Sequence, residues 1–494
     1  MVLTSVAWHG RIGTTPPHHE ERMSCMARPI DPERLRSFFT PRGIAVLGAS
    51  TKNQWFSNIA NYARRLGFDG TLWPVNPGAS EVWGYPAVSS VSKLPDEVDF
   101  AAVVLRSSQV MPALRELDAR GIRNVLVVSS GFAETGPEGK ALQEETVSFC
   151  KDRGMLLMGP NCLGFLNMNA STGVFAGGSV EGELTGGPVG IIGQSGAASE
   201  VIATKILAKG LGISLYVTTG NEAMLTTEDC IEYLLEDGVT KVICAFTEGF
   251  RDTARMRDLA VRAAVKRIPI VVVKVGRSSK GVRAASSHTG ALAGDDAVVD
   301  AFFRQHGIIR VDTIEELVET AGLFARYPLP EGGNVAICTL SGGLAGLYAD
   351  MCHELGIDLP DLGDATGDAL REVLPPFATP ANPLDVTGSG FLGGMGRIVE
   401  TLLADREVDV VLTLSFAPAG EADRFAMDIN ESWMAVARTS RKPVIPLVFR
   451  EVSPYARRYY RATGHSFIEH AGDGLKAVSH FTRYARFIRA RGAW

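Results

Sequence analysis

The chain has few cysteines, little net charge and no long hydrophobic run. Its 494 residues include seven cysteines, an odd and scattered set without a Cys-x-x-Cys pair. This pattern argues against a disulfide framework and a structural zinc site, and it predicts a cytoplasmic protein. The net charge of −6 lacks the basic excess of a nucleic-acid-binding protein. No apolar run approaches the roughly 18 residues of a membrane span, so we expect neither nucleic acid nor membrane as a partner.

Two common nucleotide-binding signatures are also missing. Gly48-Ala49-Ser50 follows an apolar run, but Ser50 stands where Gly-x-Gly-x-x-Gly needs its second glycine. The next apolar run ends in Asn76-Pro77, without an acidic residue for a ribose hydroxyl. Both features weigh against NAD. The glycine-rich stretch 341–346 is followed by no Gly-Lys-Ser/Thr, so it is not a P-loop.

Hydrophobic residues make up 46% of the sequence, which is enough for several hydrophobic cores. The length predicts about three domains of about 150 residues. Residues 1–30 form a polar stretch rich in histidine and proline, and we interpret them as a disordered tail or an over-long start before Met23 or Met26. The predicted domains are 31–170, 171–328 and 329–494.

The first domain alternates apolar runs with helical stretches. This alternation predicts an α/β fold, a doubly wound parallel sheet with helices on both faces, and ligands at the carboxyl ends of the strands. The predicted strands are 43–49, 71–75, 100–105, 124–129 and 155–158. The candidate ligand residues follow them: Gly48, Ala49, Ser50, Asn76, Pro77, Ser130, Gly131 and Asn161. Each loop alone reads as a tight turn, but the set on one edge favours a nucleotide-bearing ligand whose phosphate meets backbone N–H groups.

The second domain repeats this rhythm, with strands predicted at 188–193, 213–217, 241–246 and 270–275. A helix is predicted to begin at the segment Gln194, Ser195 and Gly196. The backbone N–H groups at its start are suited to binding a second anion. Glu248 follows the third strand. After the fourth, residues 276–294 form a small, basic loop that carries His288. A carboxylate at Glu248 would fix the tautomer of this imidazole. The alternative is an ordinary surface loop with an idle histidine.

The third domain shows further strands at 335–340, 408–414 and 444–449, with a turn at 382–385. We interpret its glycine-rich stretch as structural or interfacial. The last helix carries four arginines, which we expect to form a solvated face or to meet an acidic partner. They are Arg483, Arg486, Arg489 and Arg491.

Eight motifs along nearly the whole chain resemble those of the NDP-forming acyl-CoA synthetases, the superfamily of succinyl-CoA synthetase and ADP-forming acetyl-CoA synthetase. They are VLGAS at 46–50, VNPG at 75–78, SSGFAETG at 129–136, GPNCLG at 159–164, IGQSGA at 192–197, TGNEA at 219–223, TEG at 247–249 and SSHTGALAG at 286–294. The resemblance implies a Rossmann-like CoA-binding domain followed by two flavodoxin-like domains.

The resemblance also implies roles for particular residues. His288 matches the phosphorylated histidine, Glu248 the acid that supports it, and Ser195-Gly196 the helix start that holds the phosphate. Two departures stand out. Gly78 replaces a basic residue that many relatives use near CoA, and Met224 replaces an Asp of the acid pocket.

The chain has no further length for an ATP-grasp portion. The resemblance therefore implies an α-type ligase subunit in an oligomer with a separate ATP-grasp β-type subunit, which would hold ATP or GTP with Mg²⁺. A small carboxylic acid would receive the phosphoryl group from His288, and CoA would attack the resulting acyl phosphate. The alternatives are a non-catalytic CoA- or acyl-CoA-binding regulatory protein and, less favoured, an NAD-binding regulator.

Overall fold

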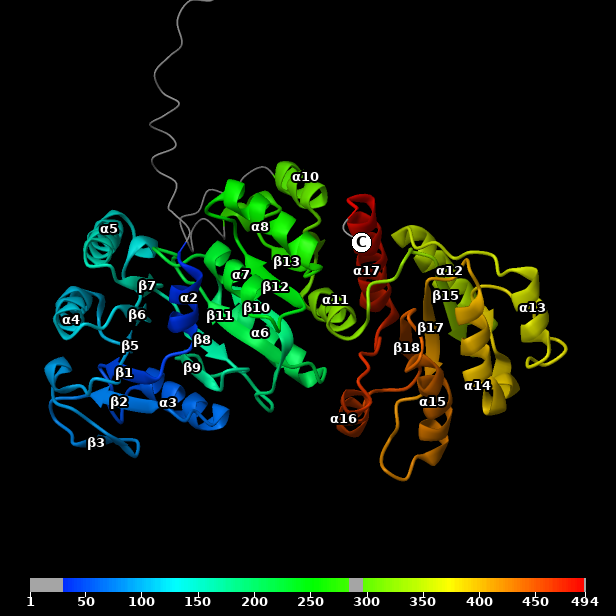
Figure 1. Ribbon diagram of the computed structural model, residues 1–494, viewed down its shortest axis with the longest axis horizontal. Coiled ribbons are helices and arrows are strands. Elements are labelled where there is room, and N and C mark those ends of the chain that lie inside the picture. Colours follow the sequence, from blue (N-terminus) through cyan, green and yellow to red (C-terminus); the bar gives the residue numbers. More distant parts are fainter. Residues whose placement is uncertain (1–29, 284–295, 493–494) are drawn as a thin grey trace, which may run out of the picture.

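The computed structural model describes residues 30–283 and 296–492, and it contains three parallel or mostly parallel sheets arranged side by side (Figure 1). The predicted tail lies outside the described residues except for Ile30. Among the described residues, no helix is long and apolar enough to cross a membrane.

The first sheet has five parallel strands in the order β2-β1-β5-β6-β7. Its strands are β1 (Gly43–Leu47), β2 (Thr71–Val75), β5 (Phe100–Val103), β6 (Asn124–Val127) and β7 (Leu156–Met158). Its helices are α2 (Pro32–Phe39), α3 (Gln54–Leu66), α4 (Ser107–Arg120) and α5 (Pro137–Asp152), and a small hairpin joins β3 (Glu81–Val82) to β4 (Tyr85–Pro86). Alternate residues of β1 enter opposite cores, Ile44 with α2 and α3 and Ala45 with α4 and α5. Both faces are therefore covered, as the continuous apolar strands predict.

The second sheet has seven strands in the order β14-β13-β12-β10-β11-β8-β9. Its parallel strands are β10 (Gly186–Gly193), β11 (Ile213–Thr218), β12 (Val242–Thr247), β13 (Ile270–Lys274) and β14 (Ile309–Val311). Two antiparallel strands, β8 (Gly164–Asn167) and β9 (Thr172–Phe175), extend it beside β11. The predicted boundary at residue 170 thus falls in a hairpin whose two strands pair with the second sheet.

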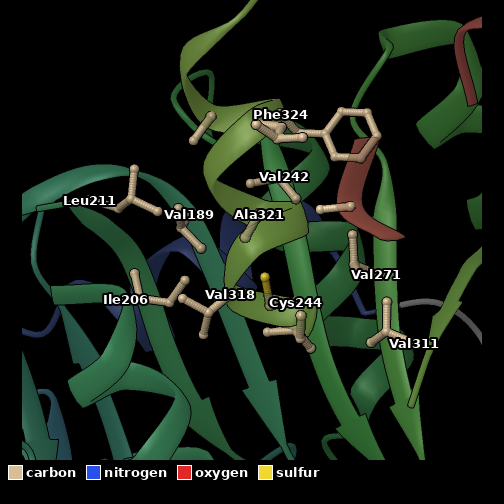
Figure 2. Packing of buried hydrophobic residues seen from close by; sticks show 14 of the residues in the cluster. Val189, Ile206, Leu211, Val242, Cys244, Val271, Val311, Val318, Ala321 and Phe324 are labelled. Carbon is tan, nitrogen blue, oxygen red and sulfur yellow. The ribbon is translucent and has the colours of Figure 1, made fainter. Parts of the chain in front are cut away.

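Helices cover both faces of the second sheet. They are α6 (Gly196–Ala208), α7 (Thr227–Glu236), α8 (Thr253–Lys266), α10 (Asp296–His306) and α11 (Ile314–Arg326). Figure 2 shows α11 lying across the strands, with Val318 and Ala321 directed at Val242 and Cys244. The opposite face packs against α7 and α8 and shares one continuous core with the first sheet. The first two sheets are therefore joined by buried apolar contacts.

The third sheet has four parallel strands in the order β16-β15-β17-β18. They are β15 (Val335–Thr339), β16 (Leu384–Asp385), β17 (Val410–Ser415) and β18 (Val444–Val448). Its helices are α12 (Gly342–Leu355), α13 (Asp364–Arg371), α14 (Thr387–Ala404), α15 (Arg424–Ala437), α16 (Pro454–Ala462) and α17 (Ala471–Ala490). The predicted turn at 382–385 is corrected, because Leu384 and Asp385 pair with Cys338 and Thr339 as an edge strand.

The last helix, α17, lies between the second and third sheets (Figure 1). It packs against α11, and residues of both helices belong to one buried cluster. Three of its four arginines, Arg483, Arg489 and Arg491, are exposed as expected, and Arg486 is half-buried. Arg486 pairs with Asp358, which follows α12 beside the third sheet. Arg491 donates to the carbonyl of Gln305 in α10, a helix of the second sheet. The basic face therefore helps to join the two sheets.

Candidate active site

Residues 194–196 and 247–249, here called the phosphate edge, lie where the neighbouring strands β10 and β12 end. The strands pair in register from Val189 with Val242 to Gly193 with Phe246, so both segments leave the sheet at the same edge. Ser195 is the N-cap residue of α6, and its side chain makes no capping bond within the described part of the chain. The first N–H groups of α6 have no partner inside the helix, which makes this end suited to an anion.

Gln194 joins the two segments of the phosphate edge. Its Nε2 donates to the carbonyl of Gly249 at 2.8 Å and to Oε2 of Glu222 at 3.0 Å. Its Oε1 accepts from the N–H of Glu248 at 2.6 Å and from Oγ1 of Thr247 at 3.0 Å. Two predicted site residues, Gln194 and Glu248, are therefore brought into direct contact through the main chain of Glu248. Glu248 itself is 7% exposed.

Glu222 is a buried carboxylate behind this edge, on the loop 219–225 between β11 and α7. Burial raises its pKa, while hydrogen bonds from Thr227 and Gln194 and the charge of Arg251 act in the opposite direction. The residue has φ of +51°, in the left-handed region that costs a non-glycine residue about 1–2 kcal/mol. Sequence reasoning quoted the TGNEA motif but assigned no role to this side chain.

His288 lies outside the described residues. The strand that leads toward it, β13, pairs beside β12 with Lys274 opposite Thr247. Lys274 is 5% exposed and donates to the carbonyl of Val275 at 2.8 Å. Burial lowers the pKa of Lys274, and the carboxylate of Asp296 partly offsets that effect. The chain thus leaves the sheet next to the strand end that carries Glu248.

The loops after β1 and β2 are held together at the edge of the first sheet. The amide Nδ2 of Asn76 donates to the carbonyl of Ala49 at 2.8 Å, and its Oδ1 accepts from the N–H of Gly78. Asn53, which sequence reasoning missed, caps α3 by accepting from two backbone N–H groups and donates to the carbonyl of Gly48 at 2.9 Å. Its signal was the Asn directly before a helical stretch. The predicted residues 48–50 and 76 therefore form one connected loop pair.

Two of the remaining first-domain residues, Gly131 and Asn161, are linked to the loop 219–225 of the second sheet, and Ser130 is exposed directly before Gly131. Glu134 accepts from the N–H of Gly131 at 2.6 Å and from the side chain of Asn221 at 2.5 Å. The Nδ2 of Asn161 donates to Oδ1 of Asn221 at 3.4 Å. Glu134 has a lowered pKa: burial would raise it, but the bonds from Asn221 and Gly131 outweigh that effect. Asn221 thus links the two sheets.

The two residues that depart from the family pattern, Gly78 and Met224, lie in different surroundings. Gly78 is exposed in the turn after Pro77. Met224 packs against the core of the first sheet that includes Leu114 and Val125. Its thioether therefore contributes to the contact between the sheets. Within the described residues, no group of three or more His, Cys, Asp or Glu side chains is placed to hold a metal ion.

Comparisons with known proteins agree with this architecture. A family described as a CoA binding domain matches residues 42–168, and one described as a succinyl-CoA ligase like flavodoxin domain matches residues 186–324. The α subunit of acetate–CoA ligase (ADP-forming) II from Pyrococcus furiosus is 36% identical over 389 residues, which are 78% of this chain and 83% of that protein.

A longer relative and a solved structure extend the comparison. The 4-hydroxybutyrate–CoA ligase (ADP-forming) of Nitrosopumilus maritimus is 32% identical over 387 residues, 77% of this chain but only 54% of that protein. The dinucleotide forming acetyl-coenzyme A synthetase 1 of Ca. Korarchaeum cryptofilum, in complex with phosphate and ADP, matches with a TM-score of 0.82 at 28% identity, over 92% of this chain and 98% of that chain. The sheets, the order of the motifs and these relatives together show that the chain belongs to the NDP-forming acyl-CoA synthetases, as a subunit of the type found as the α subunit of ADP-forming acetate–CoA ligases.

Proposed function

We propose that the phosphate edge is where this ligase subunit passes a phosphoryl group between nucleotide and acid through His288. The observation that carries the proposal is the Gln194 side chain, which ties the start of α6 to the main chain of Glu248. Backbone N–H groups at the helix start would hold the phosphoryl oxygens, and the Glu248 carboxylate would orient the imidazole. A covalent intermediate divides one difficult transfer into easier steps.

CoA would bind at the loops of the first sheet. The loop pair made by residues 48–50 and Asn76 precedes α3, whose N-terminal end suits a phosphate of the coenzyme. Ser130, Gly131 and Asn161 would complete this site, next to the loop 219–225. The CoA thiol would attack the carbonyl carbon of the acyl phosphate, forming the thioester and releasing phosphate. The acid is a small carboxylic acid; acetate and 4-hydroxybutyrate are the acids in the names of the two relatives above.

The nucleotide would be held by a separate ATP-grasp subunit of the β type, with Mg²⁺ neutralising its phosphates. Support for this comes from a relative that is 36% identical and is named as an α subunit, 83% of which is matched by this chain. We expect the working enzyme to be an oligomer of both subunits in the cytoplasm.

The test is phosphorylation of the chain in the presence of its β-type partner and ATP or GTP radiolabelled in the γ-phosphate. We expect an acid-labile, base-stable label on His288 that acid and CoA together remove. His288→Ala should carry no label. His353→Ala, at an exposed position of α12, is the matched control and should be labelled like the wild type. Equal labelling of His288→Ala would refute the assignment.

The alternative of a non-catalytic CoA-binding regulator needs the first-sheet loops but not the phosphate edge. Family membership and the bonded pair of Gln194 and Glu248 favour the enzyme. Calorimetric binding of CoA without any phosphorylation by ATP or GTP in the presence of the partner would favour the regulator instead.

A further inference from the structure

Glu222 is a buried charged side chain that the proposed reaction does not use. Its side chain is 1% exposed, and it lies on the loop 219–225, one residue after the link to the first sheet. An isolated buried carboxylate is strongly unfavourable, so its partners indicate why it is there.

Five donors converge on the two carboxylate oxygens. Oε1 accepts from Oγ1 of Thr219 at 2.9 Å and from both N and Oγ1 of Thr227, at 3.0 and 2.5 Å. Oε2 accepts from Nε2 of Gln194 at 3.0 Å and from Nε of Arg251 at 3.4 Å. Oε1 therefore faces the fixed backbone N–H of Thr227, whereas Oε2 faces the side chains of Gln194 and the half-exposed Arg251. Only a carboxylate accepts at both oxygens, because an amide has one acceptor and one donor end.

This arrangement contributes to the direction of the Gln194 amide. With Glu222 as acceptor, Gln194 must turn its NH₂ group inward, and its oxygen then faces the N–H of Glu248 and the hydroxyl of Thr247. A reversed amide would place NH₂ against the N–H of Glu248. The carbonyl of Gly249 accepts from the same NH₂ group at 2.8 Å, so the buried carboxylate and this carbonyl together hold the amide in the direction that it presents to the phosphate edge.

We propose that Glu222 is a positioning residue for phosphoryl transfer, acting through Gln194 on the main chain of Glu248 and the start of α6. The inference rests on the proposed function of the phosphate edge and adds to it a residue behind that edge. Glu222 touches no substrate in this arrangement. Its role is to keep the N–H of Glu248 and the first turn of α6 in one fixed relation.

The variant Glu222→Gln keeps the size of the side chain but introduces an NH₂ group. At the Oε1 position this group would face the N–H of Thr227, and at the Oε2 position it would face Gln194 and Arg251. Either orientation of the new amide places two hydrogen-bond donors against each other in a buried site or forces the Gln194 amide to reverse. Either outcome displaces the N–H of Glu248 relative to the first turn of α6, and misplacement of positioning groups by about 1 Å slows a reaction by about ten- to a hundredfold.

The experiment measures the initial rate of His288 phosphorylation with the β-type partner and saturating labelled ATP or GTP, for four variants and the wild type. They are Glu222→Gln, Gln194→Met, the double variant, and Glu232→Gln. The last is the matched control, because Glu232 is also buried but pairs with Arg255 and Arg262 of α8 instead of Gln194. CoA affinity by calorimetry and thermal unfolding are measured in parallel.

We expect Glu222→Gln and Gln194→Met each to lower the phosphorylation rate about tenfold or more, with KM for the nucleotide and CoA affinity unchanged. The double variant should be no slower than the slower single variant, because both act through one link. Glu232→Gln should keep the wild-type rate. A merely structural role for Glu222 would instead give additive losses and a matching fall in CoA affinity.

Two results overturn the inference in different ways. Wild-type rates in Glu222→Gln, or in Gln194→Met where Glu222→Gln does not fold, refute the positioning role while the proposed function stands. Absence of phosphorylation in the wild type under all conditions removes the proposed function, and this inference with it.

Discussion

The substitution Gly48→Ala tests whether the loop after β1 binds the coenzyme. Gly48 has φ of +88°, and a Cβ atom there would lie 2.8 Å from the carbonyl oxygen of Val104 and 2.8 Å from Cδ2 of Leu105. The backbone conformation alone costs an alanine about 1–2 kcal/mol. Relief of the close contact with the neighbouring strand end costs a further amount of about 1–3 kcal/mol. The loop must shift to make room, and Ala49 and Ser50 shift with it.

Gly67→Ala separates these two effects. Gly67 caps α3 with φ of +67°, and a Cβ atom there meets nothing within 4 Å. This variant carries the backbone penalty without the contact. We therefore expect a loss of unfolding free energy of about 1–2 kcal/mol for Gly67→Ala and about 2–5 kcal/mol for Gly48→Ala, measured by urea denaturation.

Coenzyme binding distinguishes a site from a tight turn. Calorimetry should show unchanged CoA affinity for Gly67→Ala and a loss of about tenfold or more for Gly48→Ala, because misplaced N–H groups lose bonds to a charged phosphate that are worth about 1.5–3 kcal/mol. Equal CoA affinity in the two variants, with Gly48→Ala clearly less stable, would show that this loop is only a structural turn.

Three further predictions concern polar contacts that hold the helices and sheets together. Lys209→Met should lower the unfolding free energy by about 3–5 kcal/mol in urea denaturation, because it leaves Glu319, its buried partner at 2.5 Å, uncompensated; a loss below about 1 kcal/mol, the value of a surface pair, would contradict this. Asn221→Ala should lower it by about 1.5–3 kcal/mol through the lost bond to Glu134, with Gln54→Ala, at an exposed position of α3, as a neutral control. Burial would raise the pKa of Glu316, but hydrogen bonds from His480 and a backbone N–H hold it below its ordinary value of 4.5. The difference in stability between the wild type and Glu316→Gln should therefore be largest above pH 4.5 and should shrink as the pH falls below that value. A difference in thermal unfolding that stays constant with pH would refute this.

Much of the framework could be predicted because its strands are continuous apolar runs. Most of the predicted strands of the three domains appear within a few residues of their expected limits, and the family relation follows from motifs at their carboxyl ends. The predicted limits often run past the observed strands, since apolar residues continue into the first buried turn, as at Val104 and Val128. Residue type alone does not show where sheet pairing stops.

Other features depend on contacts that no local pattern contains. The strands β8 and β9 join the second sheet because β8 pairs with β11, far along the chain. The edge strand β16 has only two residues, too few for a periodic signal. Glu134 and Asn221 meet only when two sheets come together. Sequence reasoning recognised both of their motifs but had no means of pairing them, and the roles of the predicted site residues remain predictions.

The backbone at Glu222 explains how one short loop serves two neighbours. Asn221 directs its side chain to Glu134 at the first sheet, whereas the next residue directs its carboxylate to Gln194 at the phosphate edge. In extended backbone, consecutive side chains also point apart, but the chain must turn here to enter α7. Glu222 and the nearby Gly220 both adopt the left-handed conformation in this loop, with φ of +51° and +59°, and at Glu222 this has a cost that glycine would avoid. Since glycine would remove the carboxylate, a Glu at this strained position is what we expect if the carboxylate is needed to hold Gln194 at the phosphate edge.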